Sequence, residues 1–337
     1  MTVKVGINGF GRIGRLVLRA IIEANCDDVE VIAINDLGSV EANAHLLRYD
    51  SVHGRLPGVV ETSENTITIN AHGRSFGPIA ISAQRDPSMV PFQGVDVAME
   101  CTGLFTKREA AARLLAAGAR KVLISAPGEG ADATVVYGVN HDTITPEMEV
   151  ISNASCTTNC LAPMAKVLHD NFGIVHGYMT TIHSYTGDQP TLDTLHKDLH
   201  RARAAALSSI PTSTGAARAV GLVLPALKGR LDGSAIRVPT PNVSLVSLDC
   251  ILETTPDVAR LNAVMKDAAS GHMKGILDYN DAKLVSSDFN HVPASCTFDA
   301  TQTAIVNGAV VHVLGWYDNE WGFSNRMVDV ARRFGTI

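Results

Sequence analysis

Residues 3–14, VKVGINGFGRIG, decide the fold of the N-terminal part of the chain. The apolar run at 3–7 predicts a β-strand, and Gly9, Gly11 and Gly14 follow it in the pattern G-x-G-x-x-G. Such glycines permit a tight turn and let the backbone approach a pyrophosphate at the positive end of the next helix. The segment therefore predicts a dinucleotide-binding βα unit.

Asp36 follows the next predicted strand, at 29–34, and stands 22 residues after Gly14. A carboxylate at this place accepts hydrogen bonds from the ribose hydroxyls and repels a 2′-phosphate. Leu37 comes next and brings no cation that would reverse this preference. The sequence therefore favours NAD over NADP.

Strand-like and helix-like segments alternate through the first half of the chain. Further strands are predicted at 95–100, 121–125 and 149–152, helices at 13–24 and 107–117, and an inserted hairpin at 66–70 and 79–82. This alternation is typical of α/β proteins and favours a Rossmann-type, doubly wound parallel sheet.

The pattern changes after about residue 155. A helix is predicted at 156–170, with a kink at Pro163, and another at 325–333. Long strands are predicted at 175–182, 235–238, 243–252 and 306–317, with an ordered functional loop at 185–210. We therefore expect an NAD-binding Rossmann domain with a C-terminal helix at 1–155 and 319–337. The α+β catalytic domain, with a mainly antiparallel sheet, is expected at 156–318.

The composition is that of a globular protein. Of the 337 residues, 46% are hydrophobic and 18% charged, and the net charge of −6 gives no sign of nucleic acid as a primary partner. No apolar run is long enough to cross a membrane. The six cysteines are too sparse for a disulfide framework or a zinc site, so we expect no metal and a reducing cytoplasm.

Two residues suggest the chemistry. Cys156 lies in the segment SCTTNC (155–160), at the start of a predicted helix for which Ser155 is a plausible N-cap, and His183 follows 27 residues later. A helix N-terminus and an imidazolium at His183 would both stabilise a thiolate. Together with a nicotinamide cofactor, a thiol and a base indicate aldehyde oxidation through a thioester.

Anion-binding side chains are also present in the second half. Arg binds phosphate through two parallel hydrogen bonds, and Thr hydroxyls and exposed N–H groups add short ones. The alternative is that the arginines are solvated surface charges. The candidates are Thr186, Arg201, Arg203, the segment 212–215, and Arg237.

From residue 3 to residue 333 the chain resembles the phosphorylating, NAD-dependent glyceraldehyde-3-phosphate dehydrogenases of bacteria. The blocks that carry this resemblance are residues 6–15, 35–37, 152–163, 183–189, 214–217, 237–240 and 316–320.

The resemblance implies a role for each matching residue. Cys156 is the nucleophile and His183 the base. The residues that bind NAD are Gly9, Gly11, Arg12, Ile13, Gly14, Asp36, Arg85, Ser125 and Asn319. The phosphate of glyceraldehyde 3-phosphate is bound by Thr186 and Arg237. Inorganic phosphate is bound by Ser155, Thr157, Arg201, Thr214 and Gly215.

The resemblance also implies a homotetramer in which the loop at 185–210 packs near a neighbouring subunit's cofactor. Three alternatives stay open at this point: an erythrose-4-phosphate dehydrogenase, a semialdehyde dehydrogenase, and a catalytically inactive redox-sensing protein on the same fold. Thr194-Leu195 replaces the Leu-Pro pair of some strictly NAD-dependent relatives, so the strictness of NAD over NADP also stays open.

Overall fold

A computed structural model describes residues 2–337, and the chain divides into two compact units. The first comprises Met1–Ser155 and Ser324–Ile337, and the second comprises Cys156–Phe323. The catalytic domain was expected to end at residue 318, whereas the second compact unit ends at Phe323. The Trp321 ring, in the first turn of the last helix, stacks on His291 of the second unit with ring centroids 3.8 Å apart.

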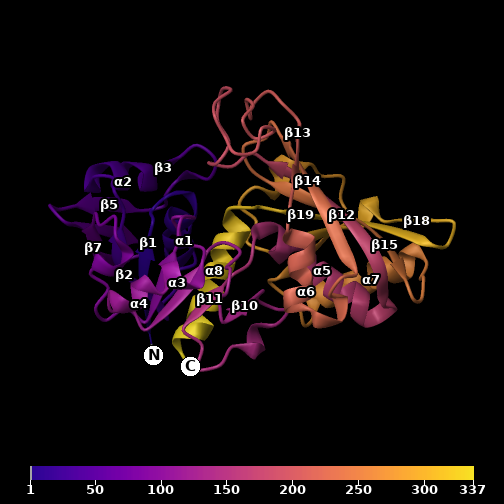
Figure 1. The fold of residues 1–337 in the computed structure, drawn as a ribbon, viewed down its shortest axis with the longest axis horizontal. Helices are drawn as coiled ribbons and strands as arrows, with labels where there is room; N and C mark the ends of the chain where they lie inside the picture. The colour runs from indigo at the N-terminus through magenta and orange to yellow at the C-terminus, as the bar shows by residue number, and fades with distance from the viewer. Residues whose placement is uncertain (1) are drawn as a thin grey trace. The chain divides into compact units, whose positions relative to one another are not determined.

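The first unit is built on a nine-stranded sheet with the order β10-β11-β9-β8-β1-β2-β7-β6-β5. Figure 1 shows this unit in indigo to magenta, together with the last helix in yellow. Its strands are β1 (Val3–Asn8), β2 (Val29–Asn35), β5 (Val59–Thr62), β6 (Thr66–Ala71), β7 (Arg74–Ser82), β8 (Val97–Glu100), β9 (Lys121–Ile124), β10 (Ala133–Thr134) and β11 (Val150–Ser152), with a separate pair β3 (Tyr49–Asp50) and β4 (Gly54–Arg55). Its helices are α1 (Arg12–Glu23), α2 (Val40–Arg48), α3 (Arg108–Ala111), α4 (Arg113–Ala116) and most of α8 (Trp321–Gly335).

The doubly wound parallel arrangement is confirmed. Strand β1 pairs in parallel with β2 on one side and with β8 on the other. The chain direction across the sheet therefore reverses at β1, and ligands of such sheets bind at the carboxyl ends of the strands where this happens. Gly9 directly follows β1 at this place.

Two segments of the first unit differ in part from their predicted structure. The helix expected at 107–117 is two short helices, α3 and α4, which meet at Ala112. The hairpin is present, because β6 and β7 pair antiparallel. However, β7 also pairs in parallel with β2, so this strand belongs to the main sheet rather than to an insertion alone.

The second unit is built on an eight-stranded sheet with the order β13-β14-β12-β15-β19-β17-β16, with β18 paired to β19. Its strands are β12 (Ile174–Ser184), β13 (Ile210–Ser213), β14 (Leu231–Val238), β15 (Ser244–Leu252), β16 (Leu277–Asn280), β17 (Cys296–Asp299), β18 (Ala304–Val306) and β19 (Val310–Tyr317). Its helices are α5 (Cys156–Phe172), α6 (Ala216–Val223) and α7 (Val258–Ser270).

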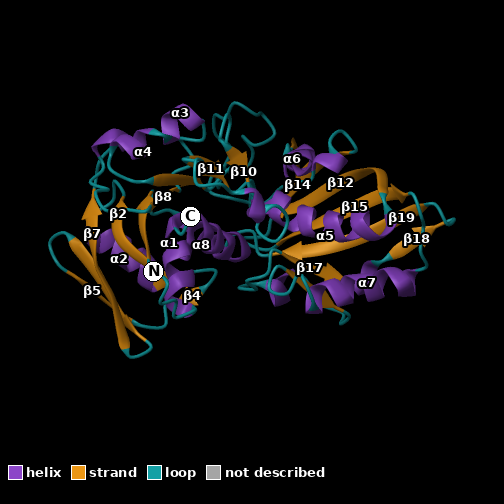
Figure 2. Cartoon of the chain, turned by 90° about the horizontal axis from the view of Figure 1, so that it is seen from below, coloured by secondary structure: helices purple, strands orange, loops and turns teal. Residues whose placement is uncertain are grey.

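This sheet is mainly antiparallel, as expected, with parallel pairs only at β12–β14 and β16–β17 among the described strands. Figure 2 shows α5 and α7 lying along one face of it. Burial alternates along β15 and β19, so every second side chain packs toward the helices and the others are partly exposed. Helix α5 continues through Pro163 as a single element.

The strand predicted at 306–317 is wrong in its first part. Residues 304–317 form a hairpin in which β18 ends at Val306 and β19 begins at Val310. Asn307 and Gly308 both have positive φ, of 50° and 64°. An Asn-Gly pair is a strong signal for a tight hairpin turn, and the apolar residues on both sides of it hide that signal.

The loop predicted at 185–210 contains no helix or strand up to residue 209, and β13 begins at Ile210. The loop is held by internal contacts. The Thr194 N–H donates to the Ala202 carbonyl at 3.0 Å, and Arg203 pairs with Asp193 at 2.7 Å. These bonds join segments that lie about ten residues apart, so the loop has a defined fold of its own.

Helix α1 closely approaches the end of β1 at Gly14, and a substitution there tests this approach. A Cβ at Gly14 would lie 2.2 Å from the Gly9 carbonyl oxygen, whereas a Cβ at Gly11 would have nothing within 4 Å. Alanine normally stabilises a helix interior relative to glycine. We nevertheless expect Gly14→Ala to lower the free energy of unfolding, by about 1–3 kcal/mol or more, because the added carbon overpacks the turn. Urea unfolding measures this effect. Gly11→Ala is the control and should cost less, and an equal or smaller loss for Gly14→Ala would contradict the close approach.

Candidate active site

Cys156 and His183 meet in the second unit. Cys156 is the first residue of α5, and His183 is the penultimate residue of β12. The Cys156 Sγ lies 3.5 Å from the His183 Nε2, within hydrogen-bonding distance for sulfur. The pair predicted from the sequence is therefore brought together, with the sulfur at the positive end of a 17-residue helix.

Arg237 completes the environment of the histidine. Strands β12 and β14 are parallel neighbours, and their register places Arg237 directly beside His183. The His183 Nδ1 lies 2.7 Å from the Ser184 carbonyl and 2.8 Å from the Arg237 Nη1. The two contacts belong to different tautomers: an Nδ1–H donates to Ser184 and leaves a lone pair on Nε2 facing the sulfur, whereas an unprotonated Nδ1 accepts from Arg237 and leaves the proton on Nε2. The first tautomer is the one in which Nε2 can accept a proton.

The charges of this pair differ from the prediction. Burial, followed by the positive charge of Arg237, lowers the pKa of His183 to about 3, so the ring is neutral near pH 7. The imidazolium expected at His183 is therefore not the group that stabilises a thiolate. Burial raises the pKa of the Cys156 thiol, and the charge of Arg237 is the largest influence in the opposite direction.

Tyr317 contacts the neighbours of both Cys156 and His183. Its hydroxyl lies 2.9 Å from the Thr157 Oγ1 and 2.9 Å from the Thr181 Oγ1. Its ring also meets the His183 ring edge-on, with centroids 5.9 Å apart. Because Thr157 follows the nucleophile and Thr181 precedes the base on β12, one buried phenol links the two elements that carry them.

Thr186 and Arg237 lie close enough to act on one anion. The Arg237 Nη1 is 3.5 Å from the Thr186 Oγ1, and the Arg237 Nε is buried without a hydrogen-bond partner among residues 2–337. A buried N–H of this kind is costly unless a ligand accepts from it. Thr186 and Arg237 are thus brought together, as predicted.

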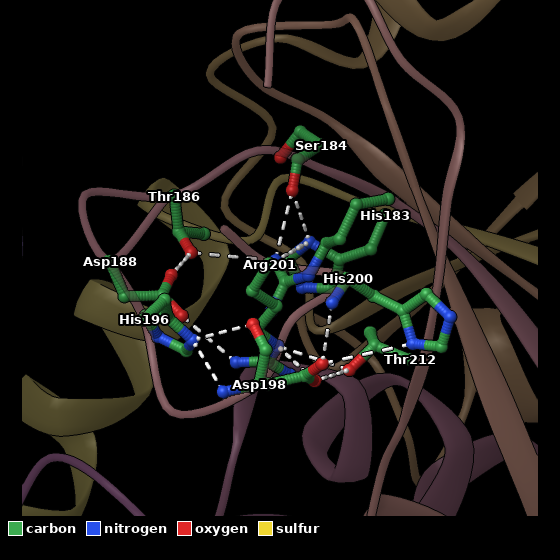
Figure 3. A network of polar contacts seen from close by, with 10 residues as sticks. His183, Ser184, Thr186, Asp188, His196, Asp198, His200, Arg201 and Thr212 are labelled. Carbon is green, nitrogen blue, oxygen red and sulfur yellow. Dashed lines mark hydrogen bonds and ion pairs between the residues drawn. The ribbon is translucent and has the colours of Figure 1, made fainter. Parts of the chain in front are cut away.

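Asp188 accepts hydrogen bonds from both Thr186 and Arg201 and so connects the Thr186–Arg237 pair to Arg201. The Thr186 hydroxyl donates to Asp188, and the Arg201 Nη1 donates to the other carboxylate oxygen at 2.9 Å (Figure 3). Burial alone would raise the pKa of Asp188, but the Thr186 hydroxyl, Arg237 and Arg201 outweigh it and hold that pKa below its usual value. Arg201 also donates to the Thr212 Oγ1 at 3.1 Å.

Thr214 and Gly215 lie at the N-terminus of α6. Gly215 is the N-cap residue of this helix, and a side chain there would have nothing within 4 Å. The Thr214 Oγ1 accepts a hydrogen bond from the Ala216 N–H. The open backbone at the start of this helix suits an anion.

Asn319 has a fixed side-chain amide. Its Oδ1 accepts hydrogen bonds from the Ser184 and Ser244 hydroxyls, each at 2.9 Å, and the residue is buried. Ser184 is the neighbour of the candidate base, so the amide and the imidazole are oriented by the same strand end.

The dinucleotide residues gather in the first unit around a cavity of about 370 Å³. It is lined by Gly9, Gly11, Asp36 and Arg85, among others. The Asp36 carboxylate accepts from the Phe10 N–H at 2.9 Å and from the Gly38 N–H at 2.8 Å, which leaves further lone pairs on both oxygens for ribose hydroxyls. The open space beside Gly11 and this oriented carboxylate fit NAD.

The other predicted cofactor residues lie near this edge of the sheet or just outside it. Arg12 and Ile13 begin α1, and the Arg12 guanidinium pairs with Asp50. Ser125 directly follows β9, and its N–H donates to the Glu100 carbonyl at 3.0 Å. Of the residues predicted to bind inorganic phosphate, Ser155 is the residue before α5, and Thr157 is buried against Tyr317.

Two residues of the site were missed in the sequence analysis as functional residues. Asp188 neutralises the arginines around Thr186, and Tyr317 links the nucleophile to the base. Both lie inside blocks that carry the family resemblance, at 183–189 and 316–320. An acidic residue two positions after Thr186 is the only signal that pointed to Asp188.

Comparison with known proteins adds a second line of evidence. Residues 3–108 match the family domain described as "Glyceraldehyde 3-phosphate dehydrogenase, NAD binding domain", and residues 155–319 match the C-terminal domain of the same family. The chain is 62% identical to the glyceraldehyde-3-phosphate dehydrogenases of Cereibacter sphaeroides and Xanthobacter flavus, with all of each chain covered. It is 58% identical to the chromosomal enzyme of Cupriavidus necator, with 98% of each chain covered.

The fold, the cavity lined by Gly9, Gly11 and Asp36, and the two family domains that match together define an NAD-dependent oxidoreductase of two domains. The chain belongs to the glyceraldehyde-3-phosphate dehydrogenase family. The alternative of an erythrose-4-phosphate dehydrogenase is not favoured, since these relatives carry the other name. Among residues 2–337, no helix is long and apolar enough to cross a membrane.

Arg237 provides a test of the charges at the site. Because Arg237 lowers the pKa of Cys156, we expect Arg237→Gln to raise that pKa and to move the pH profile of Cys156 alkylation to higher pH. Iodoacetamide alkylation followed by peptide mass spectrometry measures the profile. Arg203→Gln is the control, because Arg203 is exposed and pairs with Asp193. An unchanged profile in Arg237→Gln would contradict the electrostatic role.

Proposed function

We propose that this enzyme oxidises glyceraldehyde 3-phosphate with NAD and transfers the acyl group to inorganic phosphate, which yields 1,3-bisphosphoglycerate. The observation that carries the proposal is the 3.5 Å contact of the Cys156 Sγ with the His183 Nε2 at the N-terminus of α5, beside Arg237. The names of the relatives support the substrate. The first unit serves as the NAD-binding domain and the second as the catalytic domain.

The first half of the reaction makes a thioester on Cys156. The sulfur adds to the aldehyde carbon and forms a thiohemiacetal. The neutral His183 accepts the proton of its hydroxyl at Nε2, while the Nδ1–H donates to the Ser184 carbonyl. The N–H groups at the start of α5 stabilise the oxyanion. NAD, when bound, supplies the hydride acceptor.

The second half releases the product to phosphate. Thr186 and Arg237 hold the phosphate of the substrate. Inorganic phosphate is held by Arg201 and by the open backbone at Thr214 and Gly215, and it attacks the thioester carbon. The Cys156 thiolate then leaves, and the positive charge of Arg237 stabilises it.

The cofactor assignment follows from the first unit. Gly9, Gly11 and Gly14 form the turn that the pyrophosphate approaches, with Arg12, Ile13, Arg85 and Ser125 around it, and Asp36 binds the adenosine ribose. Asn319, whose Oδ1 is held by two hydroxyls, offers its amide to the nicotinamide carboxamide.

Single-turnover assays test this reaction. In wild type we expect a burst of NADH with glyceraldehyde 3-phosphate alone, because one thioester forms on each Cys156. Sustained turnover should begin only after phosphate is added, because phosphate is needed to cleave that thioester and free the thiol. Cys156→Ala should abolish both phases. His183→Asn should lower the rate of the burst by about 10²–10⁴-fold, the usual contribution of a general base.

Cys250→Ala is the control for these assays, because Cys250 is buried in β15 of the same unit. Steady NADH formation without phosphate would refute the phosphorylating step. An active Cys156→Ala enzyme would refute the assignment of the nucleophile.

We further propose that four chains assemble into a homotetramer that works in the cytoplasm. The face of the second sheet away from its helices carries half-exposed apolar side chains such as Leu245 and Leu314, and Leu195 in the loop at 185–210 is fully exposed. Exposed apolar surface of this kind is typical of protein–protein interfaces.

Sedimentation equilibrium tests the assembly. We expect four times the 35.8 kDa mass of one chain. Replacing Leu245 and Leu314 with Asp should lower the mass, because charges placed on an apolar interface are desolvated there. A monomer at micromolar concentration would contradict the proposal.

A further inference from the structure

Three sulfur atoms surround one small space in the core of the second unit. A Cβ built on Gly315, in β19, would lie 2.6 Å from the Cys296 Sγ, 3.4 Å from the Cys160 Sγ and 3.5 Å from the Met164 Sδ. The Cys160 Sγ donates to the Gly315 carbonyl at 3.8 Å, and Cys296 is one of the groups that raise the pKa of Cys160. The absence of a side chain at Gly315 therefore gives room to two neighbouring thiols.

The backbone of Gly315 has an ordinary strand conformation, which does not require glycine. It lies in the middle of a paired strand, opposite Val246 on β15 and Phe298 on β17. Glycine weakens a strand interior and often marks a site that needs space close to the backbone. Here the space is filled by the two sulfurs.

The thiol pair is linked to the active site through α5. Cys160 lies four residues after Cys156, so the two side chains share one face of the helix. Cys160 and Cys296 are completely buried, whereas Cys156 is partly exposed. Burial holds the pKa of Cys160 well above its usual value, so it stays a thiol and does not react with solutes directly.

We propose that Cys160 and Cys296 are a resolving pair that takes over an oxidation from Cys156 and stores it as a buried disulfide. The oxidant is hydrogen peroxide or another hydroperoxide that reaches Cys156. The inference rests on the proposed function only in that Cys156 is the reactive thiol.

The chemistry proceeds in three balanced steps. The Cys156 thiolate attacks one peroxide oxygen, the O–O bond breaks, and a sulfenic acid and hydroxide form. The Cys160 sulfur then attacks the sulfenic sulfur, and the S–O bond breaks. The hydroxyl leaves with the Cys160 proton as water. Finally, the Cys296 sulfur attacks the Cys160 sulfur, the bond from Cys156 to Cys160 breaks, and the Cys296 proton passes to the departing Cys156 sulfur.

The hydroxide of the first step takes up the proton that Cys156 received, so the net reaction reduces one hydrogen peroxide to two waters and oxidises Cys160 and Cys296 to a disulfide. Cys156 returns to its starting state. The enzyme therefore remains able to form its thioester while the oxidation is held in the core.

Helix geometry drives the last step. Side chains four residues apart on a helix have Cβ atoms about 5–6 Å apart, whereas a disulfide needs about 3.5–4.5 Å. A bond between Cys156 and Cys160 thus strains the first turns of α5, and a strained disulfide is the more easily exchanged one. Cys296 approaches Cys160 from a strand, where that strain does not arise.

The other cysteines are not part of this arrangement. Cys250 lies in β15, where burial raises the pKa of its thiol to about 12. It is not among the three heavy atoms nearest to the space at Gly315. Cys250 therefore provides a matched control, being a buried strand cysteine of the same unit.

The experiment adds one equivalent of hydrogen peroxide to the full-length protein, blocks free thiols with N-ethylmaleimide, and maps non-reduced tryptic peptides. Cys156 and Cys160 lie on one tryptic peptide, 122–166, and Cys296 on another, 284–326. Fragment ions show which cysteine of the first peptide carries the label. Residual activity is measured in parallel.

In wild type and in Cys250→Ala we expect a cross-link between the two peptides, N-ethylmaleimide on Cys156, and retained activity. In Cys296→Ser we expect no such cross-link. Instead, Cys156 should be bonded to Cys160 or over-oxidised, and activity should be lost in proportion to the peroxide added. Cys160→Ser should lose activity likewise, with Cys156 as sulfenic acid, or as sulfinic acid on at most half of the chains, because that state consumes two equivalents of peroxide.

Equal kcat before oxidation shows that the variants are folded, and Cys296→Ala serves if Cys296→Ser does not fold. The absence of the cross-link in wild type, or equal inactivation of wild type and Cys296→Ser, overturns the resolving pair. Failure of the proposed function is a separate result, because it shows as full activity of unoxidised Cys156→Ala.

Discussion

The parallel pairing of β12 with β14 is the constraint on which the active site depends. Its register places Arg237 beside His183, and the end of β12 then places His183 against the first residue of α5. A shift of one residue would turn the histidine to the other face of the sheet. The burial that follows keeps the imidazole neutral, so the base is ready to accept a proton and Arg237 is the lasting positive charge beside the sulfur.

Much of this arrangement could be predicted from the sequence, because its signals are local. The glycines after β1, the acid after β2 and the alternation of strands and helices each depend on a few neighbouring residues. The helix that begins at Cys156 was predicted for the same reason. The hairpin at Asn307-Gly308 was missed although its signal is local too, since a continuous apolar pattern on both sides of the turn favoured one long strand.

The properties that sequence reasoning got wrong or missed come from tertiary structure. An imidazolium at His183 was expected from its nearness to a thiol, but the charge of a histidine depends on its burial and on Arg237, which is 54 residues away. Asp188 was missed because its importance depends on Arg201, which reaches it from the far side of a loop. Tyr317 was missed because its partners, Thr157 and Thr181, lie on two other elements.

The last helix, α8, begins beside His291 in the second unit, and its remaining turns belong to the first. Phe334 is completely buried, and a Cβ on Gly335 would lie 2.4 Å from a methyl group of Val3. Strand β1 is thus packed against a helix that follows the whole second unit in the sequence. During translation β1 therefore lacks this packing until α8 has been synthesised.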